Sequence, residues 1–154
     1  MQRIFLLLGL VALALSACAA NEQEPPNAVD ADLSGPVLTV SIGDQDKVYT
    51  QADLEALGGV EAQEGDIVYV GVLLRTLLAD AGVDPTSLTA VKAVAVDGFS
   101  ANFGSDLFLA DTTLVAYARL DGPLADDEGP FRIVAPGQGG KMNPRMLAAL
   151  IAIK

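Results

Sequence analysis

Residues 66–82 read Asp-Ile-Val-Tyr-Val-Gly-Val-Leu-Leu-Arg-Thr-Leu-Leu-Ala-Asp-Ala-Gly, and they join a strand pattern to a helix pattern. Residues 66–70 are rich in β-branched and aromatic side chains, which favour strands. Apolar side chains then recur three and four residues apart, at Leu74, Leu77, Leu78 and Ala81. This spacing places them on one face of a helix, and glycine at residue 82 is a common stop. The stretch therefore predicts a strand over 66–70 and an amphipathic helix over 72–82.

Hairpin patterns lie on both sides of this stretch. Before it, the alternating segment 37–42 is followed by a Gly-Asp-Gln-Asp turn and a second strand pattern at 47–50. After it, the apolar segment 91–96 is followed by Asp97-Gly98, a strong short-range hairpin signal. The remaining strand patterns lie at 99–103, 113–120 and 131–135. Because hairpins outnumber helices, the sequence predicts an α+β domain built on mixed or antiparallel sheet, with a few short helices.

Three further segments have recognisable patterns. Thr50 and Asp53 have the spacing of a capping box, which predicts a short helix from residue 51. Residues 60–65 are rich in Glu, Gln and Gly, and they predict a loop. Residues 144–150 begin with proline, which suits the first turn of a helix, and they predict a terminal helix.

The first 18 residues have the order of an export signal. Arg3 supplies a short basic start, and the apolar run over 4–15 is too short to span a bilayer as a helix, which takes about 20 residues. Leu15-Ser16-Ala17-Cys18 resembles the bacterial lipobox, and Cys18 is the single cysteine of the chain. We therefore expect cleavage before Cys18 and lipid attachment to its thiol. The alternative is an ordinary signal peptide with a chance cysteine.

These observations predict three regions and a location. Residues 1–17 are the signal peptide, and 18–35 are the lipidated cysteine with a flexible acidic linker that contains a Pro-Pro pair. Residues 36–154 form the folded domain, which is enough for one core and too little for two. The expected location is the periplasmic side of the outer, or the inner, membrane, with Cys18 as the membrane anchor.

Charge and composition exclude several function classes. The net charge of −11 at pH 7 makes nucleic acid an unsuitable partner. The chain has no histidine, and no cysteine besides Cys18. Ser-His-Asp triads, Cys-His pairs and the usual zinc sites are therefore excluded, and we predict no catalytic and no metal-ligating residue. Asp126-Asp127-Glu128 packs three carboxylates together, which we interpret as a solvated hairpin flank and not as a metal site.

The order of motifs from about residue 54 to residue 152 carries a resemblance to a known family. The motifs are Gly71-Val72-Leu73-Leu74-Arg75 before a leucine-rich helix, Asp97-Gly98-Phe99, Leu114-Val115-Ala116-Tyr117, Asp121-Gly122-Pro123-Leu124 and Gly129-Pro130-Phe131-Arg132-Ile133-Val134-Ala135-Pro136. Together they resemble the molybdopterin-binding domain of sulfite-oxidase-type oxidoreductases, in its short, stand-alone form. The resemblance implies a sulfite-oxidase-like fold and, in the enzymes, a molybdenum cofactor.

This sequence departs from the enzymes of that family at the metal. Their molybdenum is held by a pterin dithiolene and by one protein cysteine upstream of the segment that corresponds to 71–75. Here residues 58–69 contain no cysteine, and they offer only Glu61, Glu64 and Asp66 as ligands. Hard carboxylates are poor substitutes for a soft thiolate. We therefore expect no bound cofactor, with molybdopterin as the alternative, and the sequence leaves open whether the chain is an enzyme.

The resemblance places a ligand pocket between the 97–99 turn, Arg75 and the loop over 137–141. That loop is rich in glycine and ends in Lys141, so its N–H groups suit an anion. The candidate ligand-binding residues are Arg75, Asp97, Gly98, Phe99, Arg132, Gly139, Gly140 and Lys141. The first hypothesis is a non-catalytic module that binds a small molecule or a periplasmic protein. The second is a molybdopterin-dependent oxidoreductase or a subunit of one, and the third is a structural lipoprotein without a ligand.

Overall fold

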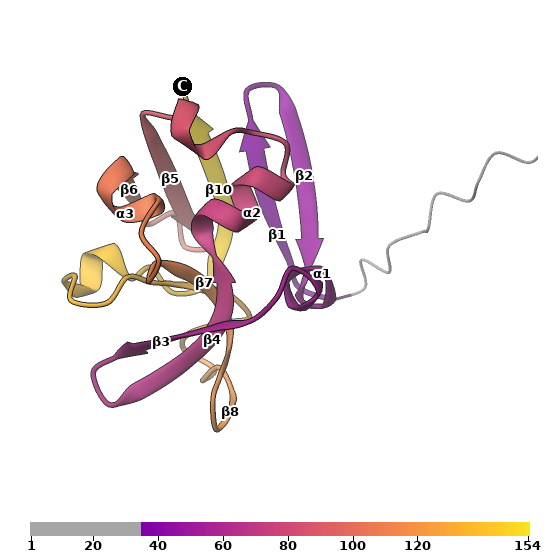
Figure 1. The fold of residues 1–154 in the computed structure, drawn as a ribbon. Coiled ribbons are helices and arrows are strands. Elements are labelled where there is room, and N and C mark those ends of the chain that lie inside the picture. Colours follow the sequence, from indigo (N-terminus) through magenta and orange to yellow (C-terminus); the bar gives the residue numbers. More distant parts are fainter. Residues whose placement is uncertain (1–34) are drawn as a thin grey trace, which may run out of the picture. The chain divides into compact units, whose positions relative to one another are not determined.

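Within residues 35–154, which are those that the computed structural model describes, ten strands form two sheets (Figure 1). The predicted signal peptide, Cys18 and almost all of the acidic linker lie outside the described residues. In sheet A, the order β2-β1-β10-β5-β6 is made by β1 (Val37–Ile42), β2 (Gln45–Thr50), β5 (Ala90–Ala95), β6 (Ser100–Gly104) and β10 (Leu147–Ile153). Strands β1 and β10 are parallel, and the other pairs of this sheet are antiparallel.

Sheet B is antiparallel throughout its described pairs. Its strands are β3 (Val60–Glu64), β4 (Ile67–Leu73), β7 (Leu114–Arg119), β8 (Gly122–Pro123) and β9 (Arg132–Val134). They follow the order β3-β4-β7-β8, and β9 also pairs with β7. Gly71 lies where β4 meets β7 so closely that a Cβ atom there would come within 2.2 Å of the Val115 carbonyl oxygen. A side chain at this position would therefore force the two strands apart.

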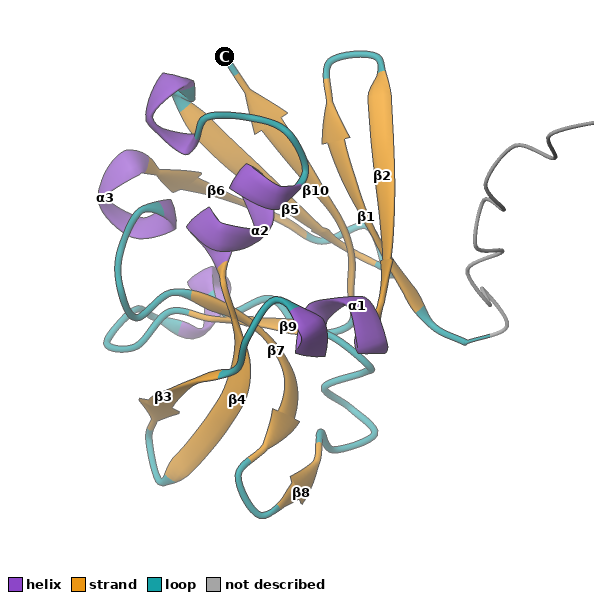
Figure 2. Cartoon of the chain, turned by 45° about the vertical axis from the view of Figure 1, so that its right-hand side comes forward, coloured by secondary structure: helices purple, strands orange, loops and turns teal. Residues whose placement is uncertain are grey.

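The helices of the described region are short (Figure 2). They are α1 (Gln51–Ala56), α2 (Leu74–Asp80), α3 (Ser105–Phe108) and the 3₁₀ turns η1 (Pro85–Ser87) and η2 (Gly140–Met142). The predicted capping box is confirmed at α1, where the Thr50 hydroxyl accepts from the Asp53 amide and the Asp53 carboxylate accepts from the Thr50 amide. None of these helices has the length and hydropathy that crossing a membrane needs.

The main hydrophobic core lies between one face of sheet A and α2. Leu74, Leu77 and Leu78, three of the four residues that define the predicted helix face, are fully buried there. Each buried leucine contributes about 1.5–3 kcal/mol by removal from water. The largest fully buried side chains also include Phe103, Phe108, Phe131, Leu38 and Leu150. Because both sheets and α2 contribute to this core, the α+β prediction is confirmed.

Two segments differ from the predictions. The predicted terminal helix over 144–150 is wrong, because residues 147–153 form β10, which bonds to β1 on one side and β5 on the other. Side chains 150–153 alternate between buried and exposed, and this period of two suits a strand despite the helix propensity of alanine and leucine. The predicted loop over 60–65 is also wrong, because it contains β3. Polar side chains are tolerated on β3 since it lies at a sheet edge.

Candidate functional site

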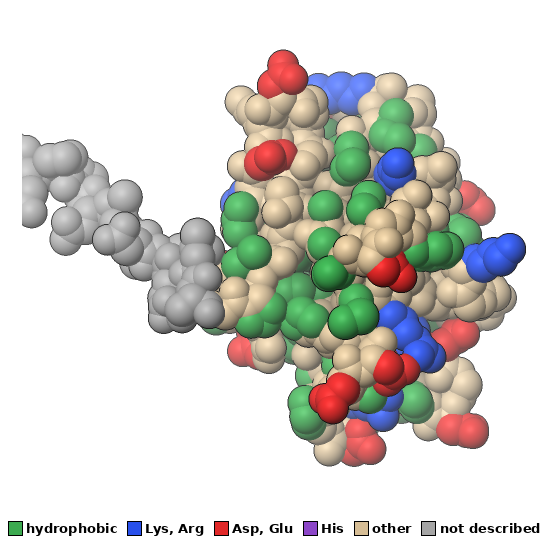
Figure 3. Space-filling view, turned by 180° about the vertical axis from the view of Figure 1, so that it is seen from behind, with side chains coloured by type: hydrophobic (Ala, Val, Ile, Leu, Met, Phe, Trp, Pro, Cys, Tyr) green, Lys and Arg blue, Asp and Glu red, His purple; other side chains and the backbone are tan. Residues whose placement is uncertain are grey.

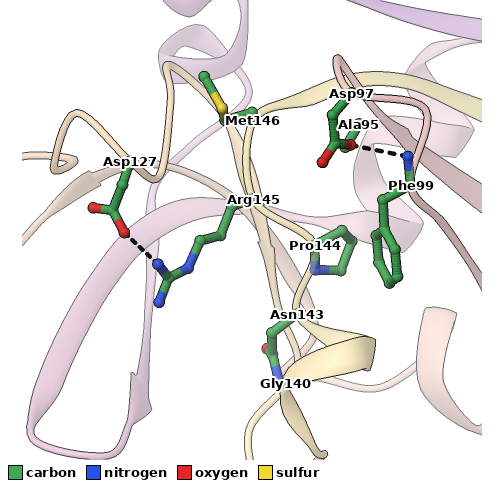
Figure 4. A pocket seen from close by; sticks show the side chains of 9 residues that line it. All are labelled: Ala95, Asp97, Phe99, Asp127, Gly140, Asn143, Pro144, Arg145 and Met146. Carbon is green, nitrogen blue, oxygen red and sulfur yellow. Dashed lines mark hydrogen bonds and ion pairs between the residues drawn. The ribbon is translucent and has the colours of Figure 1, made fainter.

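A cavity of about 300 Å³ opens between the β5–β6 turn and the segment that leads into β10 (Figure 4). Its lining residues are Ala95, Asp97, Phe99, Asp127, Gly140, Asn143, Pro144, Arg145 and Met146. The volume suits a small molecule, at the lower end of ordinary ligand pockets. Among the cavities described in residues 35–154, this is the one whose lining combines charged, amide and aromatic side chains.

The β5–β6 turn presents an aromatic ring to this cavity. The Asp97 carboxylate accepts a hydrogen bond from the Phe99 amide at 2.9 Å, which holds the turn closed. Gly98 has φ of +85°, a conformation that glycine adopts without strain. Phe99 is 42% exposed, although an aromatic side chain of this size is normally buried. The turn therefore offers an apolar platform beside a carboxylate.

The glycine-rich loop after β9 is fixed from inside by Asn143. This side chain is buried, and its Oδ1 atom accepts from the Ala135 amide at 2.7 Å. Its Nδ2 atom donates to the Gln138 carbonyl at 3.1 Å. At the start of the same loop, the Gly137 amide donates to the Glu64 carboxylate at 3.2 Å. One side chain within the loop and one from β3 therefore set its shape.

Charged groups on the cavity rim give it a net negative balance. Arg145 forms an ion pair with Asp127, and both side chains are more than half exposed. Asp97 is the third charged lining residue, so two carboxylates face one guanidinium. An exposed ion pair of this kind contributes little to stability, about 0–1 kcal/mol. Its charges remain accessible to a ligand.

Glu128, next in the chain after Asp127, is the centre of a buried ionic cluster. It is 2% exposed, and one oxygen accepts from the Tyr69 hydroxyl at 2.7 Å and from Arg132. The other oxygen accepts from two Arg119 nitrogens, at 2.7 and 2.9 Å. Burial alone would raise the pKa of the Glu128 carboxyl, but these hydrogen bonds, with one from the Ala125 amide, outweigh it and lower the pKa to about 2.

The cluster supports the cavity wall through the backbone. The Glu128 carbonyl accepts from the Met146 amide at 2.7 Å. Met146 has φ of +49°, which among the described residues makes it the one non-glycine residue with positive φ. Gly129 packs so closely that a Cβ atom there would lie 2.8 Å from the Met146 Cα atom. The buried cluster around Glu128 therefore contacts Met146, the lining residue with positive φ, through the backbone.

The structure brings together some of the predicted binding residues and separates others. Asp97, Phe99 and Gly140 line the cavity, and Gly98, Gly139 and Lys141 adjoin lining residues in the chain. Arg75 does not line it. Arg75 donates to the Leu109 carbonyl, pairs with Asp111 and borders another cavity, of about 380 Å³. Arg132 is buried against Glu128 and does not line the cavity either.

Several important residues were not predicted. The solvated-flank interpretation of residues 126–128 is wrong for Glu128, because nothing in the local sequence distinguishes it from the two preceding aspartates. Asn143, Arg145 and Met146 line the cavity, but the sequence predicted a helix for Arg145 and Met146 and no element for Asn143. Residues 147–153 are apolar throughout, so the sequence has no alternation that marks this strand or the loop before it.

Comparison with known proteins places this fold in a family. The oxidoreductase molybdopterin-binding domain family matches residues 40–154, which is most of the chain. The chain belongs to that family. A comparison with curated proteins gave no match.

A solved structure similar to this molybdopterin-binding domain is the sulfane dehydrogenase SoxCD from Paracoccus pantotrophus, with a TM-score of 0.61 and 22% sequence identity. The match covers 77% of this chain and 38% of the SoxCD chain, so this chain spans well under half of that protein's length. The likeness shows a shared fold, which confirms the predicted sulfite-oxidase-like architecture.

The family implies a molybdenum cofactor, but the residues of this domain do not fit its metal. The region expected to supply the thiolate forms the β3–β4 hairpin, where Glu61, Glu64 and Asp66 are the acidic side chains. No group of three or more histidine, cysteine or acidic residues in the described part of the chain has metal-binding geometry. The arginines at residues 132 and 145 are each paired with a carboxylate. This donor set lacks a soft ligand for molybdenum.

Proposed function

We propose that this chain is a lipoprotein of the periplasmic side of a membrane, whose molybdopterin-binding domain is a non-catalytic module for a small molecule or a protein. The observation that carries this proposal is the donor set of the domain. The region expected to supply the thiolate has carboxylates and no cysteine, and Arg132 and Arg145 are each paired with a carboxylate. A domain with this chemistry can retain the fold and a pocket while losing the metal.

The cavity of about 300 Å³ is the binding site in this proposal. Its Phe99 ring and Met146 side chain are each 42% exposed, so they offer apolar contact area to a ligand. Asp97, Asp127 and Arg145 give polar contacts around that surface. Lys141 adjoins the lining residue Gly140 in the chain, so the rim has charges of both signs for a polar ligand.

Metal and pterin content test the proposal directly. The full-length protein is expressed with its signal peptide, purified from membranes and assayed for molybdenum by mass spectrometry and for pterin by fluorescence after oxidation. We expect neither, in a host that loads a control molybdenum enzyme. Near-stoichiometric molybdenum would overturn the proposal. It would instead support the second candidate, a molybdopterin-dependent oxidoreductase or subunit, which the family match over residues 40–154 favours.

Ligand binding is tested separately with a panel of amino acids, sugars and inorganic anions in thermal-shift measurements. A compound that raises the melting temperature of the wild type is retested on Phe99→Ala, which removes the exposed ring, and on Leu120→Ala. Leu120 is also exposed but borders another cavity, so it is a matched control. We expect the stabilisation to be lost in Phe99→Ala alone. Equal stabilisation of all three proteins would place the site elsewhere.

A further inference from the structure

The outer face of sheet A is a separate feature, on the side opposite the core. Burial alternates along β5 and along the middle of β1, so every second side chain there points away from the core. The strand register aligns these outward positions in two rows across four strands. One row contains Val48, Thr39, Ala149 and Val94, and the other contains Asp46, Ser41, Ile151 and Lys92.

The charges on this face balance each other. The chain has a net charge of −11, but the two rows contain one aspartate and one lysine among eight positions, so the net charge of the rows is zero. Val48 is 41% exposed and Ile151 is 36% exposed. The view from behind shows several hydrophobic side chains on this side of the molecule, with separate acidic and basic side chains among them (Figure 3). Such a surface differs from the acidic character of the whole chain.

We propose that this face pairs with the same face of a second copy of the chain. The twofold axis lies in the interface, parallel to the strands and between β1 and β10. Two-sheet packings keep their strands within about 30° of each other at a separation of about 10 Å, which this symmetry allows. The axis places β2 opposite β5 of the second copy and β1 opposite its β10.

This symmetry makes the face complementary to itself. Asp46 and Lys92 lie in the same row, on strands β2 and β5, so each Asp46 faces the partner subunit's Lys92. The ion pair forms twice, because contacts across a twofold axis are reciprocal. In the other row, Val48 faces the partner subunit's Val94, and the small residues between them face one another. Opposite charges therefore meet at the edges, and uncharged side chains meet at the centre.

The size of the face sets the strength of the pairing. The axis leaves β6 without a strand opposite it, so four strands about 4.8 Å apart and about 17 Å long give roughly 330 Å² for each copy. Stable interfaces bury about 800 Å² for each partner, so we infer a weak, reversible dimer. The lipid that we propose on Cys18 would confine both copies to one membrane, where the effective concentration is high. The pairing itself does not depend on the proposed ligand-binding function.

Cross-linking in membranes that contain the full-length protein tests this pairing. Ser41→Cys puts a thiol beside the axis, and a short bismaleimide should join two copies there. The wild type is the control for reaction at Cys18, and Asp121→Cys, in the turn between β7 and β8, is the control for random collision. We expect a covalent dimer with Ser41→Cys and not with either control. The same low yield for all three chains would overturn the proposal.

Charge reversal in the Ser41→Cys chain then tests the symmetry. Asp46→Lys and Lys92→Asp each place like charges opposite one another twice, so each should lower the yield about tenfold. The double substitution restores both pairs and should restore the yield. Asp121→Lys, which changes net charge as Asp46→Lys does, should not lower it. If only the repulsion between two negatively charged chains mattered, Asp46→Lys would raise the yield of covalent dimer. That result would overturn the proposed axis, and so would a double substitution that fails to restore the yield.

Discussion

The Glu128 carbonyl accepts a hydrogen bond from the Met146 amide at 2.7 Å, while the Glu128 side chain lies in a buried cluster with two arginines and a tyrosine. One residue thus connects the ionic centre of the domain to the wall of the candidate ligand cavity. Met146 itself lines that cavity with a positive φ. Since backbone strain persists only where surrounding contacts hold it, Glu128 is a residue on which the shape of the site depends.

Glu128→Gln should therefore destabilise the domain strongly. The substitution keeps the shape but removes the charge, so the guanidinium of Arg132, which is 4% exposed, loses its carboxylate partner. Breaking a buried ion pair in this way costs about 3–5 kcal/mol. Urea denaturation measures the change. Asp126→Asn, at an exposed carboxylate two residues earlier, should change stability by less than about 0.5 kcal/mol. Equal effects from the two substitutions would contradict this role for Glu128.

The same carboxyl predicts how stability depends on pH. Its folded pKa of about 2 lies below the ordinary value of 4.5, so the folded state favours the ionised form. The resulting stability is fully present above about pH 4.5 and is lost as the pH falls towards 2. A shift of this size corresponds to roughly 3 kcal/mol. Denaturation at several pH values should show a decline in the wild type that is smaller in Glu128→Gln. Parallel curves for the two proteins would contradict the prediction.

Gly129→Ala and Gly137→Ala separate backbone strain from steric contact. Both glycines have similar positive φ, +73° and +75°. A Cβ atom at Gly129 would lie 2.8 Å from the Met146 Cα atom, whereas one at Gly137 would meet nothing within 4 Å. Gly137→Ala should therefore cost about 1–2 kcal/mol from the backbone alone, and Gly129→Ala should cost more. Thermal unfolding measures both, and a larger loss for Gly137→Ala would refute the close contact.

The lipid anchor is tested at Cys18. Cells that express the full-length protein are labelled with a radioactive fatty acid, and the protein is then isolated from membranes. The wild type should incorporate label, and Cys18→Ser should not, because the lipid is attached through the thiol. Ser16→Ala keeps a small residue before the cysteine and should retain the label. Labelling of Cys18→Ser would contradict this assignment.

The fold was more predictable from sequence than the site. Asp97-Gly98 and the leucines of α2 predict their elements correctly, because turn chemistry and helical spacing are local properties. The helix predicted over 144–150 was wrong because the place of β10 between β1 and β5 is decided by distant pairing. For the site, Asp97 and Phe99 of the predicted motif line the cavity, and their role in binding stays a prediction. The burial of Arg132 depends on Glu128 and Tyr69, and Tyr69 is 63 positions away, so no local pattern predicts it.

Asn143 offers a test of the other wall of the cavity. Its Oδ1 atom accepts from the Ala135 amide, and its Nδ2 atom donates to the Gln138 carbonyl. Asn143→Ala removes both hydrogen bonds, whereas Asn143→Asp keeps the acceptor and places a carboxylate oxygen against the carbonyl. Both should destabilise the domain, by about 1–3 kcal/mol, since a buried polar group loses its partner.

Hydrogen exchange distinguishes the two Asn143 substitutions. In Asn143→Ala the Ala135 amide has lost its acceptor, so it should exchange about tenfold faster than in the wild type. In Asn143→Asp that amide should stay protected at neutral pH, while the loop over 136–140 opens because the donor to Gln138 is gone. The Leu150 amide, in β10 at the centre of sheet A, reports global unfolding. If the Ala135 amide exchanges equally fast in both variants at equal global stability, the Oδ1 contact does not hold this loop.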